Sequence, residues 1–243
     1  MIRQMRRGRW LWVLLVSSLL ASAQEVAVTA RVALMDGGKK NQPRQAGNVV
    51  LWLAPQAGAV PAVWPAADPP RRPRLVQKNK RFNPHVLVVP VGSVVEFPNE
   101  DQFFHNVFSL FDGKRFDLGL YEAGTTRDVH FDKPGISYIF CNIHAEMSAV
   151  VIALNTPYYG ISDAQGQVVI PHVPAGRYAL HIWYEAALPE VLNRMTREIV
   201  VSENNSTLGL LRLPAVTTPL AHKNKYGQDY PPPAPDSSTY QHP

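Results

Sequence analysis

The 243-residue sequence contains a single cysteine, Cys141. An intrachain disulfide framework, which small exported domains often use, is therefore excluded. A lone cysteine in an exported chain is buried and inert, bridged to another chain, or a ligand for something bound. Metal ligation would protect the thiol from oxidising surroundings, so the residues around Cys141 are the first place to look for function.

A dominant charge of one sign is also missing. The chain has 24 Lys and Arg residues against 19 Asp and Glu residues, a formal net charge of +5. Four of the basic residues lie in the first 23 positions, and without them 20 positive charges face 19 negative ones. A net charge of about +1 argues against a protein that binds nucleic acid or an anionic membrane.

The N-terminus has the features of a signal peptide. Its positive n-region contains Arg3, Arg6, Arg7 and Arg9. The apolar stretch Trp10–Ala21 is too short to cross a bilayer comfortably, since that takes about 20 residues. Ala21-Ser22-Ala23 supplies the small residues of a cleavage site. We therefore expect a signal peptide over residues 1–23 and a periplasmic protein. An uncleaved membrane anchor is the alternative, and both Sec and twin-arginine export stay open.

Proline, in contrast, is abundant, with 22 residues. Proline removes a backbone donor and breaks helices, so the count indicates strands, turns and extended tails. Short alternating or apolar runs separated by turn residues predict an all-β chain with sandwich or barrel architecture. We predict these segments: N-terminal strands over 24–57, a Pro/Ala linker over 58–74, a strand-rich domain over 75–155, a second β-domain over 156–213, and a disordered Pro-rich tail over 214–243.

The most informative motif is C-x2-H-x2-M, formed by Cys141, His144 and Met147. A thiolate, an imidazole and a thioether are soft to borderline ligands that suit copper cycling between Cu(I) and Cu(II). A His2Cys site with a weak axial Met needs a second histidine. His105 is the best candidate, because it lies on an upstream apolar segment that a neighbouring strand would bring beside the loop. These four residues predict one copper ion.

This motif resembles the cupredoxin family, especially its amicyanin-like members and the exported proteins described as methylamine-utilisation-like. The resemblance covers about residues 75–155 and implies a Greek-key β-sandwich with a type 1 (blue) copper site. It implies His105, Cys141, His144 and Met147 as ligands. It also implies that Asn106 ties the two ligand segments together and directs its backbone N–H at the Cys141 sulfur. Ala145 departs from the pattern, where such relatives often have proline.

Each of these residues has an ordinary structural interpretation when taken alone. A single cysteine is usually a small buried hydrophobe, and Met147 would suit core packing. Zinc is an alternative metal for a thiolate site. The remaining histidines are expected to be structural, exposed or in the tail: His85, His130, His172, His181, His222 and His242.

The region 156–213 resembles the carboxypeptidase regulatory-like, or transthyretin-like, β-sandwich. The resemblance rests on the turn Asp163–Gly166 and on the P-x-G-x-Y pattern of Pro174, Gly176 and Tyr178. That family's first two strands normally precede this turn directly. Val26–Val32 and Asn48–Leu53 look like those strands, so we predict that the cupredoxin-like domain is inserted into this second, smaller sandwich. Pairing of Val49–Leu53 with cupredoxin strands alone would contradict the hypothesis.

One-electron transfer between redox partners is the leading functional hypothesis, and the cupredoxin resemblance implies an electron carrier rather than an enzyme. The apolar surface at Ile143, His144 and Met147 would meet a partner of unknown identity. A copper carrier without redox duty is an alternative, against which the count of five methionines argues. An interaction module with structural copper is another. A multicopper enzyme would need His-x-His pairs, and a hydrolase would need a nucleophile-elbow motif. Neither motif is present in the sequence.

Overall fold

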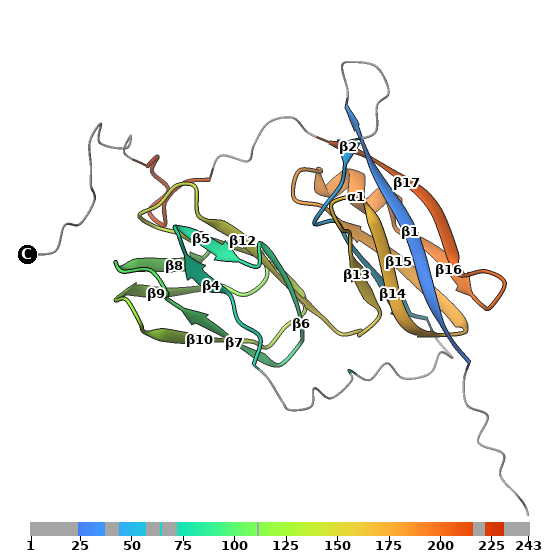
Figure 1. The fold of residues 1–243 in the computed structure, drawn as a ribbon, viewed down its shortest axis with the longest axis horizontal. Helices are drawn as coiled ribbons and strands as arrows, with labels where there is room; N and C mark the ends of the chain where they lie inside the picture. The colour runs from blue at the N-terminus through green and yellow to red at the C-terminus, as the bar shows by residue number, and fades with distance from the viewer. Residues whose placement is uncertain are drawn as a thin grey trace, which may run out of the picture.

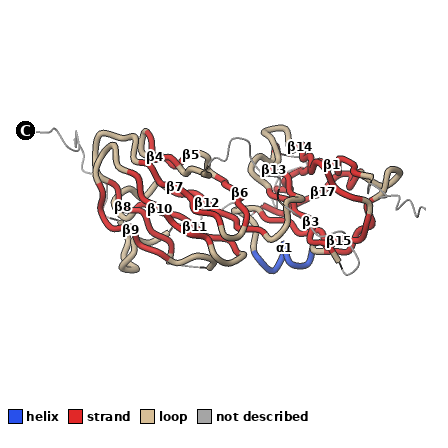
Figure 2. Tube along the Cα trace, turned by 90° about the horizontal axis from the view of Figure 1, so that it is seen from below, coloured by secondary structure: helices blue, strands red, loops and turns tan. Residues whose placement is uncertain are grey.

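The computed structural model describes residues 24–36, 44–56, 64, 72–110, 112–215 and 222–230. Over these residues the chain consists of β-strands and one short helix, α1 (Pro189–Met195), which confirms the prediction of an all-β fold. Figure 1 shows two bodies of strands side by side, and Figure 2 shows them from below. No described helix has the length and apolar character needed to traverse a membrane. The signal peptide predicted over 1–23 lies outside the described residues.

The first body, here called the terminal sandwich, is built from strands that precede residue 56 and strands that follow residue 158 (Figure 1). One sheet has the order β14-β1-β17, with β2 beside β1, and the other has the order β13-β3-β15-β16. The strands are β1 (Glu25–Asp36), β2 (Arg44–Gln45), β3 (Val50–Pro55), β13 (Tyr159–Ile161), β14 (Gln167–Pro174), β15 (Gly176–Trp183), β16 (Arg197–Val201) and β17 (Thr207–Ala215).

The pairing of β1 and β3 bears on the insertion hypothesis. β1 lies antiparallel to β14 and parallel to β17. β3 lies antiparallel to β13 and β15, with Leu53 opposite Leu180. Both early strands therefore pair with strands that follow residue 156, as the insertion hypothesis predicts. The likeness of this sandwich to the regulatory-like family stays a prediction.

The second body, here called the inserted sandwich, contains β4 to β12 (Figure 1). Its five-stranded sheet has the order β6-β12-β11-β8-β9, and β10-β7 and β4-β5 form two-stranded sheets. The strands are β4 (Val76–Lys78), β5 (Arg81–Asn83), β6 (Val86–Pro90), β7 (Ser93–Pro98), β8 (His105–Ser109), β9 (Phe116–Tyr121), β10 (Thr126–Phe131), β11 (Gly135–Cys141) and β12 (Ser148–Leu154).

Alternation of burial explains how these strands pack. In β10, Val129 and Phe131 are buried while the residues beside them are exposed, as expected of a strand with one face on a core. β8 is buried at all five positions and lies between β11 and β9 in its sheet. Its first residue, His105, is thus carried into the protein interior by the strand.

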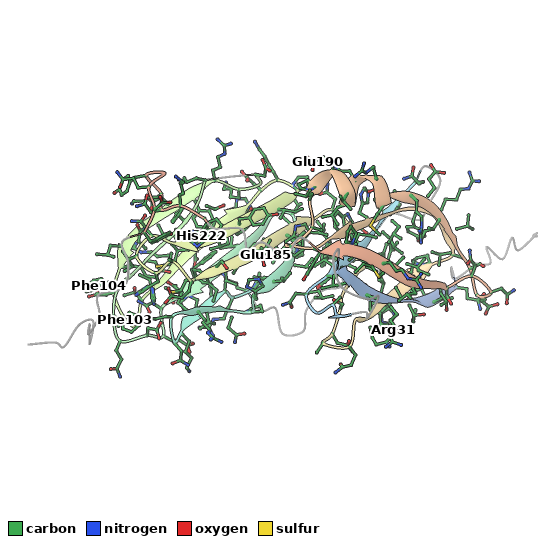
Figure 3. The ribbon with its side chains drawn as sticks, turned by 90° about the horizontal axis from the view of Figure 1, so that it is seen from above. Arg31, Phe103, Phe104, Glu185, Glu190 and His222 are labelled. Carbon is green, nitrogen blue, oxygen red and sulfur yellow. The ribbon has the colours of Figure 1, made fainter. Side chains whose placement is uncertain are left out.

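The two bodies share apolar contacts and polar contacts. Val86 and Val150 of the inserted sandwich belong to the same buried cluster as Leu180 of the terminal sandwich. At the same junction the Trp183 indole N–H donates to the Tyr138 hydroxyl at 3.4 Å. Figure 3 shows Glu185 between the two bodies.

Two predicted segment boundaries need correction. Within the predicted linker, Pro73 and Arg74 already run beside β7, where the amide of Glu96 donates to the Pro73 carbonyl at 2.9 Å. The prediction of a disordered tail over 214–243 is wrong for two stretches. Pro214 and Ala215 complete β17, and residues 222–230 make specific hydrogen bonds to the inserted sandwich. The sequence did not indicate these contacts, because such short stretches have no hydrophobic periodicity that would point to their partners.

Candidate metal centre

Strand pairing brings the predicted ligand segments together. β11 ends at Cys141 and lies antiparallel to β8, with Cys141 opposite Val107. His105 starts β8, so it projects beside the loop that follows Cys141. That loop carries His144 and returns at Met147 into β12, which pairs with β11. Two adjacent strands and one short loop thus converge on one end of the inserted sandwich.

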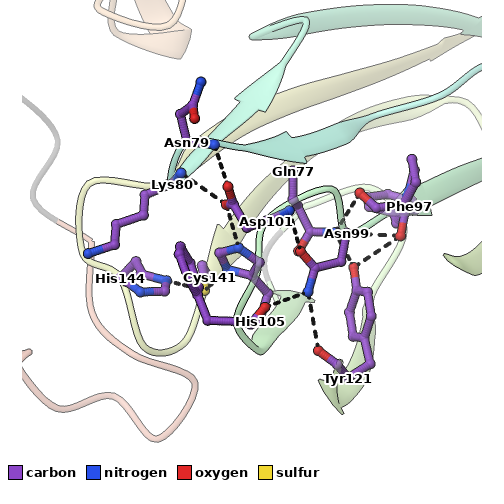
Figure 4. A network of polar contacts seen from close by, with 12 residues as sticks. Gln77, Asn79, Lys80, Phe97, Asn99, Asp101, His105, Tyr121, Cys141 and His144 are labelled. Carbon is purple, nitrogen blue, oxygen red and sulfur yellow. Dashed lines mark hydrogen bonds and ion pairs between the residues drawn. The ribbon is translucent and has the colours of Figure 1, made fainter. Parts of the chain in front are cut away.

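The three nitrogen and sulfur ligands form a compact cluster (Figure 4). The Cys141 Sγ lies 3.6 Å from Nδ1 of His105 and 3.5 Å from Nδ1 of His144. All three atoms lie within 4.8 Å of one another. Bonds of about 2.0 Å to imidazole nitrogen and about 2.3 Å to thiolate sulfur, at angles of roughly 110–120°, place the two ligand atoms roughly 3.5–3.8 Å apart. The cluster therefore fits a single metal ion bound by all three residues.

Asp101 fixes the orientation of His105. Its Oδ2 lies 2.9 Å from Nε2 of His105, and its carboxylate also accepts the backbone N–H groups of Asn79 and Lys80. With Nε2 engaged as a donor, Nδ1 is the nitrogen left to face the sulfur. Burial lowers the pKa of His105 and outweighs the opposing effect of Asp101, so the imidazole is held in the neutral, ligand-competent form.

His144 lies nearer the surface than His105. Burial, followed by the proximity of His105 and Lys80, lowers its pKa to about 4. Its ring contacts Phe103 and His105 edge-on, with centroids 5.6 Å and 5.0 Å away. This residue is therefore neutral at ordinary pH and links the buried sulfur to the protein surface.

Cys141 has no exposed surface. Burial raises the pKa of its thiol, while hydrogen bonds from the backbones of Ile143, Asn106 and His144 act in the opposite direction. The Asn106 backbone thus acts on the thiol in the direction that the predicted contact requires, and its role beside a bound metal stays a prediction. Asn106 also accepts a hydrogen bond from the amide of Asn142 at 2.8 Å, so it joins the His105 strand to the Cys141 loop.

Met147 is fully buried in the same apolar cluster as Cys141. Its amide donates to the His144 carbonyl, and its own carbonyl accepts from the amide of Cys141, both at 3.2 Å. These bonds close the loop and hold Met147 beside the other three residues. The role of its sulfur as an axial ligand stays a prediction.

Among the residues that the structure describes, the other histidines lie away from this cluster, except His222. His85 contacts the Ser148 carbonyl and Glu185 at the junction of the two sandwiches. His181 stacks on Trp52, and His172 pairs with Glu25. His222, expected to lie in a disordered tail, instead packs on Phe140 beside the Cys141 loop. No pattern in the sequence signalled this position, since Phe140 and Ala145, its partners on the inserted sandwich, are more than seventy residues away.

No family model matches the sequence, and no curated protein matches it. Solved structures that are similar cover about a third of the chain. They include a Cu-containing nitrite reductase from Thermus scotoductus SA-01, with 27% identity over 35% of this chain and a TM-score of 0.33. This match spans only 23% of the nitrite reductase.

A purple cupredoxin from Nitrosopumilus maritimus is 21% identical over 34% of this chain and 99% of its own, with a TM-score of 0.31. A reduced Cu(I) form of an amicyanin mutant is 17% identical over 34% of this chain and 82% of its own, with a TM-score of 0.33. The resemblance to cupredoxins noted in the sequence is thus found among solved structures too, over about a third of the chain.

Proposed function

We propose that this chain is a type 1 copper protein that carries single electrons in the periplasm. The observation that carries the proposal is the cluster of Cys141 Sγ with Nδ1 of His105 and His144 at 3.6 and 3.5 Å. One thiolate and two imidazoles are the equatorial donors of an electron-transfer copper site, and Met147 would be the weak axial ligand. Bound copper would supply a centre that gains and loses one electron.

The protein's own groups support rapid electron transfer in a further way. His105 and Cys141 are both fully buried. His105 is held by Asp101, and the loop after Cys141 is closed by backbone hydrogen bonds to Asn106 and Met147. Ligands that are fixed before the metal binds have little freedom to rearrange between oxidation states, which keeps the reorganisation needed for electron transfer small.

The surface around His144 is the proposed contact for a redox partner. Phe104 and Ile143 expose 41% and 40% of their surface at this end of the molecule, and Figure 3 shows Phe103 and Phe104 at the end remote from the terminal sandwich. His144 lies behind this apolar patch and is the least buried of the three clustered ligands. A small apolar patch suits brief encounters with a partner protein.

The visible spectrum of the exported protein with added Cu(II) tests the proposal. An intense blue thiolate-to-copper absorption that disappears in the Cys141→Ala variant supports it. A colourless protein that binds copper without this absorption contradicts the type 1 assignment. Uptake of zinc with higher affinity and no copper colour would indicate a structural metal site instead.

Electron transfer is separated from copper carriage by a second measurement. A carrier has to release its metal, whereas an electron-transfer protein cycles while retaining it. Reversible one-electron reduction without copper loss over many cycles favours electron transfer. Loss of copper on each reduction favours the carrier.

A further inference from the structure

Residues 222–230 form a segment that lies against the ligand loop, about eighty residues beyond it in the chain. Figure 1 shows the segment beside the inserted sandwich, and in Figure 4 its pale red ribbon runs next to the loop that carries His144. It is here called the strap. The strap is internally ordered by Asn224, whose Oδ1 accepts the amides of Tyr226 and Gln228, both at 3.0 Å.

Three polar groups of the ligand loop are bound by the strap. The Tyr230 hydroxyl donates to the carbonyl oxygen of Cys141 at 2.8 Å. Nε2 of His222 donates to the carbonyl oxygen of Ala145 at 2.7 Å. The amide of Lys225 donates to Oδ1 of Asn142 at 3.0 Å. One bond is thus made to a ligand residue itself, and the others are made to positions directly beside Cys141 and His144.

The strap is also linked to the strand that bears His105, through Asp117 of the neighbouring strand β9. Nζ of Lys225 lies 2.8 Å from Oδ2 of Asp117, and only 18% of the lysine side chain is exposed. The other carboxylate oxygen of Asp117 accepts from the side-chain amide of Asn106 at 2.8 Å. A chain of hydrogen bonds therefore runs from Lys225 through Asp117 to the neighbour of His105.

Aromatic packing completes the contact. The His222 ring stacks on Phe140, with centroids 4.0 Å apart and planes inclined by 24°. Tyr230 contacts the His222 ring edge-on, with centroids 5.2 Å apart. Since Phe140 precedes Cys141 on β11, the strap also covers the strand that delivers the thiol.

We propose that the strap positions the copper ligands: it holds the Cys141–Met147 loop closed, so that Cys141 and His144 stay at metal-binding distance before metal arrives. The inference deepens the proposed function. Apart from the strap, the loop is restrained by the backbone hydrogen bonds of Cys141, Asn142 and Met147 and by the buried side chain of Met147, and the strap adds three hydrogen bonds to it. Without the strap, the carbonyl groups of Cys141 and Ala145 would turn to water and the loop would sample open arrangements.

The test uses the full-length chain and the Tyr230→Phe variant, which removes one hydroxyl and keeps the ring. Tyr226→Phe is the matched control, because Tyr226 lies on the same strap and is 71% exposed. Amide hydrogen exchange over residues 142–147 is measured first in copper-free protein. Loss of one hydrogen bond should speed exchange in Tyr230→Phe by about fivefold, with the terminal sandwich and the control unchanged.

Copper-loaded protein gives the second readout. Tyr230→Phe should release copper to a chelator several-fold faster and shift both the reduction potential and the thiolate-to-copper absorption. If the strap only packed against the loop without positioning the ligands, the thiolate-to-copper absorption would stay the same in this variant. His222→Ala, which removes a different contact, should act in the same direction in both experiments.

The outcomes separate the strap from the copper assignment. If wild-type protein takes up no copper, the proposed function fails. Hydrogen exchange of the copper-free protein still tests whether the strap restrains residues 142–147. If loop exchange in Tyr230→Phe and His222→Ala equals that of wild type, the strap does not position the loop. Faster exchange with unchanged spectrum, potential and release would make it a stabilising cover without influence on the ligands, and would also overturn the proposal.

Discussion

Oδ2 of Asp101 lies 2.9 Å from Nε2 of His105, so a carboxylate four residues upstream holds the most deeply buried imidazole of the cluster. Removing this acceptor in Asp101→Ala leaves a buried N–H without its partner. We expect copper affinity to fall by about 10- to 100-fold, the usual effect of losing a group that orients a ligand. Competition titration against a chromophoric chelator measures the loss.

Asp101→Asn is the matched control for this prediction. The side-chain amide of asparagine keeps one acceptor oxygen. That single oxygen would have to accept from His105 and from the backbone N–H groups of Asn79 and Lys80. Its copper affinity should lie between that of wild type and that of the alanine variant. Equal affinity in all three proteins would mean that Asp101 does not orient His105.

Met147 allows packing to be distinguished from metal ligation. The side chain is fully buried, so Met147→Ala should lower the free energy of unfolding by about 2–5 kcal/mol. Met147→Leu keeps the volume and should cost less than about 1.5 kcal/mol. If the sulfur is an axial ligand, Met147→Leu still binds copper but has a changed reduction potential. An unchanged potential in the leucine variant would assign Met147 to the core alone.

Much of the metal centre could be predicted from the sequence because its determinants are local. Cys141, His144 and Met147 share one loop, and their spacing alone restricts the geometry. His105 was placed by the expectation that a neighbouring apolar strand lies beside that loop, and the β8–β11 pairing has this form. The resemblance of residues 156–213 to the regulatory-like family predicts that the two early strands belong with this later region, and β1 and β3 do pair with strands there.

The strap and the junction between the sandwiches could not be predicted, for a common reason. His222 and Tyr230 bind through hydrogen bonds and ring contacts, in a short polar stretch without hydrophobic periodicity. His85 and Glu185 meet across two bodies and are separated by 100 positions. Such contacts form between strands and segments that are far apart in the chain. Sequence patterns indicate only which face of its own strand a residue occupies.

The role of the early strands leads to a stability prediction. Leu51 of β3 is fully buried in the terminal sandwich, opposite Ile182 of β15. Leu51→Ala should therefore lower the free energy of unfolding of this sandwich by about 2–5 kcal/mol while leaving the copper absorption unchanged. Chemical denaturation followed by intrinsic fluorescence and by the copper absorption measures the two effects separately. A loss of absorption in native buffer would mean that the ligand loop depends on the terminal sandwich.

The contact between His85 and Glu185 should make stability depend on pH. Nε2 of His85 lies 2.6 Å from the Glu185 carboxylate, and this hydrogen bond raises the pKa of His85, against the opposing effect of burial. A raised pKa in the folded protein means that protonation favours the folded state. The added stability is therefore complete below about pH 6.5, the ordinary histidine value, and is lost as pH rises through the higher folded-state pKa.

His85→Gln should remove this dependence. The difference in unfolding free energy between wild type and variant should be largest below about pH 6.5 and shrink as pH increases. Thermal unfolding across this range measures it, with His130→Gln, an exposed histidine of β10, as the control. Since the contact joins the two sandwiches, the acid-side stabilisation should also reduce their relative motion in solution scattering. A pH-independent difference would show that His85 contributes through its shape and not through its charge.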